Sequence, residues 1–384
     1  MIYLDNAATT RPLPEVIDAM MSYLTDKWYN PSSSYQYGQE VMKDIEKARE
    51  FFARSINAES PDEIYFVSCG SEANNWALRG WHGGYPYIIT DNIEHHSVLN
   101  AMNTYTGALG QKRIVKANKT GCVDIEGLIE TIENIPNKDS LSTDIIISTM
   151  WLNNEIGTIQ PIKLIGDIAK KYNAFFHVDA VQSFGKLPLD VQKYNISMLS
   201  TSSHKIGAPR GSGFLYVRKG TPLKPLIYGG QQERHMRAGT ENVAGIMGFK
   251  KATEIALEHM EENTAKLYKL KDYFISTLDK INSIDIINRH MNTFPSTISV
   301  DFGVPAEAMM AYFDQFNIAV SSGSACNSRD DTPSHVLMAI GLSPKKANRV
   351  IRFSFSPDIT EEQLDYVTKI AQNGIEVLKQ CERF

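Results

Sequence analysis

Two residues near the middle of the chain, Lys205 and Asp179, carry side chains that could bind a carbonyl cofactor. A lysine amine can form a Schiff base with an aldehyde, and Lys205 follows a run of small polar residues from Ser200 to His204. Asp179 ends an apolar stretch, Phe175 to Val178, where a carboxylate is costly unless it is paired. A protonated pyridine nitrogen is one such partner. An aspartate that only caps the next turn explains the residue about as well.

Small polar residues at two places could hold a phosphate. Ser202, Ser203 and His204 stand directly before the lysine, and Gly70 and Ser71 lie in a turn between an expected strand and an expected helix. Backbone N–H groups at such a helix start attract anions. The Ser71 hydroxyl could also cap the helix, and a plain N-cap turn explains that stretch on its own. Taken together with the lysine and the aspartate, in this order, these stretches predict pyridoxal 5′-phosphate (PLP).

Three further residues could contact the ring of such a cofactor. His95 and His96 follow an expected strand and begin a helix; one imidazole could stack on a flat ring and move protons near neutral pH, although paired histidines there are also ordinary surface residues. Asn154 lies in a polar loop typical either of a site or of a structural turn. Gln182 follows Asp179 by three residues, within reach of the phenolic oxygen of PLP.

A cysteine and an arginine in the last quarter of the chain could act on a substrate. Cys326 lies among small and polar residues from Ser321 to Asp331, which predicts an exposed loop. Exposure and a nearby cation such as Arg329 favour a thiolate nucleophile. Arg352 alternates with apolar neighbours on an expected strand and could bind a carboxylate through two hydrogen bonds. The alternative for Arg352 is a solvent-facing strand residue.

Strands and helices alternate between about Asp62 and Lys219. The expected strands are Glu63–Ser68, Tyr87–Thr90, Asp144–Met150, Phe175–Asp179, Met198–Thr201 and Gly213–Val217, and the expected helices are Glu72–Trp81, His96–Tyr105 and Ile162–Tyr172. This alternation predicts an α/β fold with a mainly parallel sheet. Ligands in such sheets bind outside the carboxyl ends of the strands, and the candidate residues fall at those ends.

The rest of the chain predicts a smaller α+β unit. Val41 to Phe52 has helical spacing, and Phe249 to Ile281 predicts one long helix or two in sequence. Strands are expected at 297–302 and 349–354, and a last helix is expected after Thr360, with Gln363 completing a capping box. We therefore expect a large PLP-binding α/β domain at residues 15–257. Residues 1–14 and 258–384 form a small domain that carries the cysteine loop.

Composition narrows the function classes. The chain has 39 basic and 44 acidic residues among 384, a net charge of −5, which argues against a nucleic-acid binder. Its four cysteines include no CxxC pair, so neither a disulfide framework nor a zinc site is expected. The first residues do not resemble a signal peptide, and no apolar run reaches membrane-spanning length. We expect a cytoplasmic protein that binds neither membrane nor nucleic acid.

With these residues assembled, the chain resembles the cysteine desulfurases, which are class V members of the PLP-dependent aminotransferase fold (type I). The matching motifs run nearly end to end: Tyr3-Leu4-Asp5-Asn6-Ala7-Ala8-Thr9-Thr10, Asn30-Pro31-Ser32-Ser33, Glu94-His95, Asn153-Asn154-Glu155-Ile156-Gly157, His177-Val178-Asp179-Ala180, Ser203-His204-Lys205, Gly229-Gly230-Gln231-Gln232-Glu233, Arg237-Ala238-Gly239-Thr240, Ser322-Gly323-Ser324-Ala325-Cys326 and Ile351-Arg352-Phe353-Ser354. The loop after Cys326 is similar to that of the iron–sulfur-assembly type (group I).

The resemblance implies a role for each candidate. Lys205 holds PLP and moves the substrate's α-proton, Asp179 pairs with the ring nitrogen, and His95 stacks on the ring. Gln182 and Asn154 bond the ring-oxygen side. The phosphate contacts are Gly70, Ser71, Ser202, Ser203 and His204, with Thr240 reaching in from the other subunit of a homodimer.

The resemblance also implies the reaction. Arg352, helped by Asn154, takes the carboxylate of L-cysteine, and Cys326 accepts the sulfur as a persulfide. L-alanine is released, and the sulfur passes to an acceptor protein for iron–sulfur cluster assembly or another thiolation pathway. Cys69 stands where the family usually carries glycine.

Two alternatives stay open on the sequence alone. Selenocysteine lyase or another class V PLP enzyme keeps the cofactor but changes the reaction, and comparing L-cysteine with L-selenocysteine separates them. A non-enzymatic sulfur carrier or scaffold partner belongs to a different class. The presence of Lys205, Asp179, His95 and Cys326 speaks against it, and a colourless protein would favour it.

Overall fold

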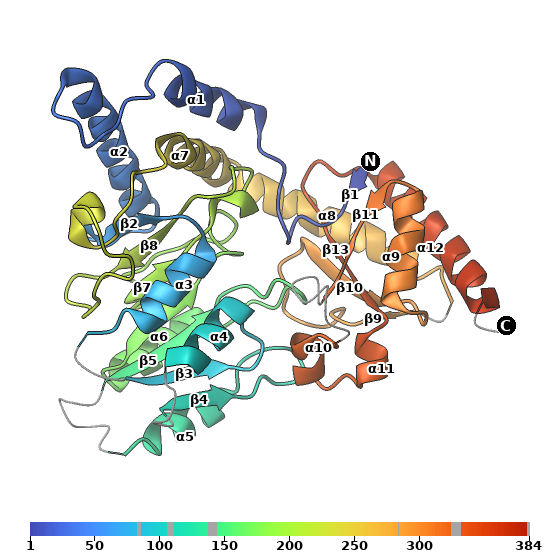
Figure 1. The fold of residues 1–384 in the computed structure, drawn as a ribbon. Helices are drawn as coiled ribbons and strands as arrows, with labels where there is room; N and C mark the ends of the chain where they lie inside the picture. The colour runs from blue at the N-terminus through green and yellow to red at the C-terminus, as the bar shows by residue number, and fades with distance from the viewer. Residues whose placement is uncertain (83–85, 106–110, 137–143, 283, 324–331, 382–384) are drawn as a thin grey trace.

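A seven-stranded, mostly parallel sheet lies at the centre of the larger part of the molecule (Figure 1). The computed structural model describes residues 1–384 except 83–85, 106–110, 137–143, 283, 324–331 and 382–384. In spatial order the strands are β2 (Ile64–Val67), β8 (Gly213–Val217), β7 (Met198–Ser200), β6 (Phe175–Asp179), β5 (Ile145–Met150), β3 (Tyr87–Asp91) and β4 (Lys112–Val115). The pairs from β7 to β4 are parallel, whereas β8 is antiparallel to both of its neighbours.

Helices cover both faces of this sheet, which explains why its strands are apolar on both sides. In β5, Ile145 and Ile147 pack into the core on one face and Ile146 into the core on the other. The first face is covered by α2 (Gln36–Ser55), α5 (Ile125–Glu133), α6 (Ile162–Lys171) and α7 (Val243–Glu258), and the second by α3 (Gly70–Arg79) and α4 (His96–Tyr105). Helix α1 (Pro14–Thr25) packs on α7.

A second, smaller core surrounds an antiparallel sheet. Its strand order is β12 (Ser321–Ser322), β13 (Val350–Ser354), β10 (Thr297–Asp301) and β9 (Asp285–Ile286). The flanking helices are α8 (Met260–Leu278), α9 (Ala306–Gln315), α10 (His335–Ala339), α11 (Pro344–Ala347) and α12 (Glu361–Cys381). Phe274, Phe353 and Val367 are fully buried in this core.

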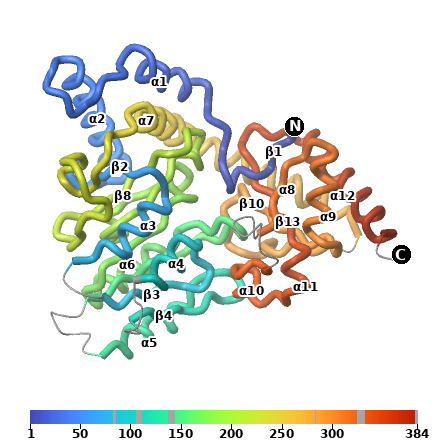
Figure 2. Tube along the Cα trace, in the orientation of Figure 1, coloured from blue at the N-terminus to red at the C-terminus, as the bar shows by residue number. Residues whose placement is uncertain are grey.

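The N-terminal arm joins the smaller sheet region. Strand β1 (Ile2–Tyr3) pairs in parallel with β11 (Ile318–Ala319), and Figure 2 shows the arm running from α1 to the elements of the C-terminal part. We propose that the two cores are two domains with the limits expected from sequence. Among the described residues, no helix is long and apolar enough to cross a membrane.

The expected elements of the large sheet are present, with ends shifted by a few residues. The stretch Phe249 to Ile281 is two helices, α7 and α8, which break at His259. The capping box of the last helix is confirmed: the Gln363 N–H donates to Thr360 Oγ1 at 3.3 Å, and the Thr360 N–H donates to Gln363 Oε1 at 3.1 Å. Strand β4 was not anticipated, and neither were helices α1, α5, α9, α10 and α11.

Candidate active site

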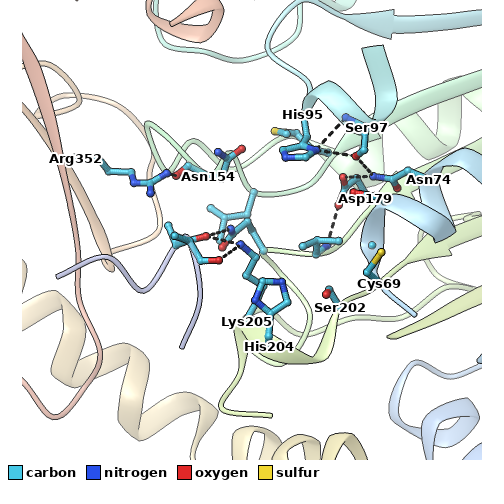
Figure 3. A pocket seen from close by; sticks show the side chains of 18 of the residues that line it. Cys69, Asn74, His95, Ser97, Asn154, Asp179, Ser202, His204, Lys205 and Arg352 are labelled. Carbon is cyan, nitrogen blue, oxygen red and sulfur yellow. Dashed lines mark hydrogen bonds between the residues drawn. The ribbon is translucent and has the colours of Figure 1, made fainter. Parts of the chain in front are cut away.

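One cavity of about 280 Å³ gathers most of the predicted site residues at the carboxyl ends of the parallel strands (Figure 3). Its lining includes Gly70, Ser71, His95, Asn154, Asp179, Gln182, Ser202, His204, Lys205 and Arg352. Lys205 lies between Arg352 and Asp179 in the view of Figure 3. Of the remaining candidates, Ser203 and Thr240 lie outside the lining, and Cys326 lies outside the described residues.

Lys205 is placed by a short 3₁₀ turn, Ser203–Lys205, that follows β7. Its Nζ donates to the carbonyl oxygens of Ala7 and Ala8, at 2.6 and 2.7 Å. These carbonyls belong to the N-terminal arm, far away in sequence. The arm therefore holds the amine of Lys205 inside the cavity.

Asp179 is the last residue of β6 and only 5% exposed. Its Oδ2 accepts a hydrogen bond from Asn74 Nδ2 at 2.7 Å, and its Oδ1 accepts one from the Val181 N–H at 2.9 Å. The Val181 contact confirms that Asp179 caps the turn that follows β6. The Asn74 contact adds a second hydrogen bond to the same carboxylate and helps to hold it in the cavity wall.

His95 is held in one tautomer by its neighbour Ser97. The Ser97 N–H lies 3.1 Å from His95 Nδ1, and Ser97 Oγ lies 2.7 Å from the same nitrogen. Asn74 Nδ2 in turn donates to Ser97 Oγ at 2.8 Å. Nδ1 therefore accepts, and the neutral ring carries its proton on Nε2. Burial lowers the pKa of His95, with Asp179 acting in the opposite direction, so the neutral ring prevails at neutral pH.

The turn into α3 has the close packing expected of an anion seat. A Cβ at Gly70 would lie 2.4 Å from Val181 Cγ2, so only glycine fits without a shift. Cys69 is the N-cap residue with φ −171°, an extended backbone that any residue adopts; glycine is not required there. The expected cap by Ser71 is wrong, because Ser71 is the second residue of the helix and no side chain caps its start.

The other side of this seat is formed by the residues before Lys205. Ser202 Oγ is buried and has no hydrogen-bond partner in the described part of the chain. His204 Nδ1 lies 3.1 Å from Thr9 Oγ1, and burial lowers the pKa of His204 to about 4. Ser203, in contrast, uses its hydroxyl to donate to the carbonyl of Pro209. We therefore leave Ser203 out of the proposed set.

Arg352 on β13 is 3% exposed, so the solvent-facing alternative is wrong. Its Nη1 donates to the Asn154 carbonyl at 2.9 Å, and its Nη2 donates to Asp5 Oδ1 at 2.6 Å. Its Nε has no hydrogen-bond partner among the described residues. A buried guanidinium with an unused donor is suited to bind a carboxylate.

Several residues that shape the cavity escaped the sequence interpretation. Asn74 follows Gly70 by four residues, so it faces the same side of α3 one turn later, and that spacing was a usable signal. Just outside the lining, beside Asn154, Glu155 accepts a hydrogen bond from Ser334 Oγ, and burial raises the pKa of Glu155 to about 7. The contacts of Lys205 with the Ala7 and Ala8 carbonyls could not be predicted, because every residue has a backbone carbonyl and the sequence does not mark which ones are used.

The residues present fit PLP. The cavity combines an amine, a hydrogen-bonded carboxylate, a neutral imidazole and a phosphate seat in which the buried Ser202 hydroxyl lacks a partner from the described chain. A phosphate oxygen would complete the hydrogen bonding of that hydroxyl. The aldehyde, the ring nitrogen and the phosphate of PLP each find a matching group here.

Comparisons with known proteins agree with this geometry. The class-V aminotransferase family matches residues 2–367. Cysteine desulfurase IscS of Dictyoglomus turgidum is 41% identical over 384 residues, covering 98% of this chain and 95% of that relative. A NifS-like protein from Rickettsia africae has a TM-score of 0.89 at 32% identity, covering 98% of this chain and 99% of that one.

A further solved structure, SspA in complex with cysteine, has a TM-score of 0.79 at 33% identity and covers 93% of this chain and 99% of that one. The family match spans nearly the whole chain, and the relatives are similar over almost their full length. The chain therefore belongs to the class-V aminotransferase family of PLP-dependent enzymes and, within it, to the cysteine desulfurases.

Proposed function

We propose that this protein converts L-cysteine to L-alanine and transfers the sulfur to Cys326. The observation that carries the proposal is the single cavity in which Lys205, Asp179 and Arg352 meet. The relatives named cysteine desulfurase and the SspA structure with cysteine support L-cysteine as the substrate.

The residues that would hold PLP are those of the cavity wall. Lys205 would supply the amine, Asp179 would pair with the ring nitrogen, and His95 would stack on the ring. Gly70, Ser71, Ser202 and His204 would hold the phosphate, while Gln182 and Asn154 would bond the ring oxygen. When bound, PLP withdraws electrons from the substrate and thereby makes both its α-proton and its Cβ–S bond labile.

Arg352 would bind the substrate carboxylate. Its guanidinium is already held from two sides, by Asp5 and by the Asn154 carbonyl, so little side-chain entropy remains to be lost on binding. Its unused Nε adds a donor for the incoming carboxylate. Burial strengthens these charge-assisted hydrogen bonds.

Lys205 would carry the α-proton on its Nζ. The Ala7 and Ala8 carbonyls hold this amine in the cavity, which fixes where the proton is taken up and returned. His95 is neutral, with its proton on Nε2, so it can donate a hydrogen bond without adding a positive charge beside Lys205.

Cys326 would take the sulfur as a persulfide. The reaction balances as L-cysteine plus the Cys326 thiol giving L-alanine plus the Cys326 persulfide, with no outside oxidant or reductant. Gly323, three residues earlier, lines the cavity, so the cysteine segment begins at the site. A sulfur-acceptor protein, in iron–sulfur cluster assembly or another thiolation pathway, would then remove the outer sulfur.

We also propose that the enzyme works as a homodimer. Thr240 is exposed and lies outside the cavity of its own chain, which is consistent with a contact to the phosphate seat of a second copy. Sedimentation that finds the PLP-loaded protein to be a monomer would contradict this.

Replacing Lys205 tests the proposed function. Lys205→Ala should remove the visible absorbance of the purified protein and its production of L-alanine from L-cysteine, because the amine is lost from the cavity. Lys193→Ala changes an exposed lysine and should leave both unchanged. A Lys205→Ala protein that still releases L-alanine at the parent rate would refute the proposal.

A further inference from the structure

A second, larger cavity lies against the one that holds the site residues. It has a volume of about 600 Å³ and shares Ala7, Gln182 and Lys205 with the first cavity. Lys186 lines only the second cavity, and its side chain is partly exposed. None of the roles proposed above uses this lysine.

Lys186 contacts the candidate site through Gln182. Lys186 Nζ donates to Gln182 Oε1 at 3.3 Å. On the other side of the same amide, Gln182 Nε2 donates to the Ala7 carbonyl at 2.8 Å, and that carbonyl also accepts from Lys205 Nζ at 2.6 Å. Gln182 is only 8% exposed, so water has little access to its amide.

The chemistry of an ammonium group decides which way this amide points. In its ammonium form, which prevails below about pH 7, Lys186 has three donors and no acceptor, so it can contact the oxygen of an amide but not its NH₂ group. Turning the amide over would place N–H groups against the Lys186 ammonium and an oxygen against the Ala7 carbonyl. Both contacts would become repulsive, because each pairs donors with donors or acceptors with acceptors.

We propose that Lys186 is a positioning residue that binds the Gln182 oxygen and thereby keeps the NH₂ group of Gln182 toward the cofactor. This inference rests on the proposed function and deepens it. The ring oxygen of PLP is an acceptor, so the NH₂ group is the side of Gln182 that it requires. Of the contacts within the described residues, removing Lys186 leaves that of the shared Ala7 carbonyl to select this orientation.

A competing explanation is that Lys186 acts by charge alone. Desolvation of its amine, followed by repulsion from Lys205, lowers the pKa of Lys186 to about 7. In that case the positive charge of Lys186 would act on Lys205 by electrostatic repulsion, and the effect would not depend on Gln182. The two explanations therefore differ in whether the effect of Lys186 depends on the Gln182 side chain.

A double-mutant cycle between Lys186→Met and Gln182→Leu separates them. The readouts are the dissociation constant of PLP, from absorbance titration of the cofactor-free protein, and the pH midpoint of the visible band. Lys186→Met should weaken PLP binding about tenfold, about 1.4 kcal/mol. In the Gln182→Leu background, the same change should have less than a twofold effect.

Two further variants complete the design. Lys186→Arg keeps the donors and should bind PLP within about twofold of the parent. Lys271→Met is the matched control, because burial also lowers the pKa of Lys271 in α8. Its Nζ donates to Thr293 Oγ1 at 2.6 Å, and neither of these two residues lines either cavity. Lys271→Met should change neither readout. If Lys186→Met does not fold, as judged by circular dichroism, Lys186→Gln replaces it with the same expectation.

Two results would overturn the inference. One is a folded Lys186→Met protein with parental PLP affinity and pH midpoint. The other is a loss of affinity that is equally large in the Gln182→Leu background, which would indicate a charge effect. Failure of the proposed function is distinguishable from both, because the unaltered protein would then fail to bind PLP or to release L-alanine from L-cysteine.

Discussion

At the scale of single residues, the chemistry-bearing side chains were predictable and their partners were not. Lys205, Asp179 and Arg352 stand out because a charged side chain in or beside an apolar strand is costly to bury unless it is paired. What holds them depends on contacts between distant segments: Asn74 for Asp179, the Ala7 carbonyl for Lys205, and Asp5 for Arg352. Sequence spacing within one segment cannot reveal such contacts.

The buried position of Arg352 leads to a kinetic prediction. Arg352→Lys should raise the KM for L-cysteine at least about tenfold, because a lysine cannot reproduce the planar, two-pronged contact to a carboxylate. The PLP absorbance should stay intact. Steady-state kinetics and a visible spectrum measure both quantities.

Arg349→Lys is the control, since Arg349 precedes the same strand and pairs with Asp301 at 2.8 Å. Its KM should stay at the parental value. An Arg352→Lys enzyme with an unchanged KM would show that the carboxylate binds elsewhere.

At the scale of elements, the long buried strands and amphipathic helices were predictable because each carries a clear pattern. The capping box at Thr360 marked the start of α12 correctly. The short strands β9, β11 and β12 have two residues each, too few to show any periodicity. Strand β4 lies at the edge of the sheet and begins with two charged residues, Lys112 and Arg113, so it lacks the apolar pattern of the other strands.

His177 joins three neighbouring strands and makes their stability depend on pH. Its Nδ1 lies 2.8 Å from Ser148 Oγ on β5, and its Nε2 lies 2.9 Å from Ser200 Oγ on β7. Burial lowers the pKa of His177 from 6.5 to about 3. Because the folded state disfavours the proton, this contribution to stability is complete above pH 6.5 and is lost as the pH falls toward 3.

The expected effect is a free energy of unfolding about 2 kcal/mol lower at pH 5 than at pH 8 from this residue. Asp91 and Glu155, whose pKa values are raised to about 7 by burial, act in the opposite direction. The effect of His177 is therefore the difference between the protein and its His177→Gln variant, measured by urea unfolding at both pH values.

His290→Gln, a change at an exposed histidine, serves as the control and should keep the parental pH dependence. If His177→Gln also keeps the parental pH dependence of the free energy of unfolding, the His177 imidazole does not titrate as the structure indicates.

At the scale of the whole molecule, the site exists only because two cores and the N-terminal arm meet. The large sheet supplies Asp179 and Lys205, the small sheet supplies Arg352, and the arm supplies the Ala7 carbonyl. The alternation of elements predicted the large sheet, and the strand and helix patterns of the rest of the chain predicted the smaller α+β unit. The contact between the arm and Lys205 could not be predicted from the sequence, because the position of the arm depends on the pairing of β1 with β11.

The most direct test of the account is to locate the sulfur after reaction. The PLP-loaded protein is incubated with L-cysteine in the absence of a sulfur-acceptor protein, and the masses of its peptides are then measured by mass spectrometry. We predict the mass of one added sulfur atom on Cys326, and none in the Lys205→Ala variant. Sulfur on Cys69, Cys122 or Cys381 instead, or equal labelling of Cys326 without Lys205, would contradict the account.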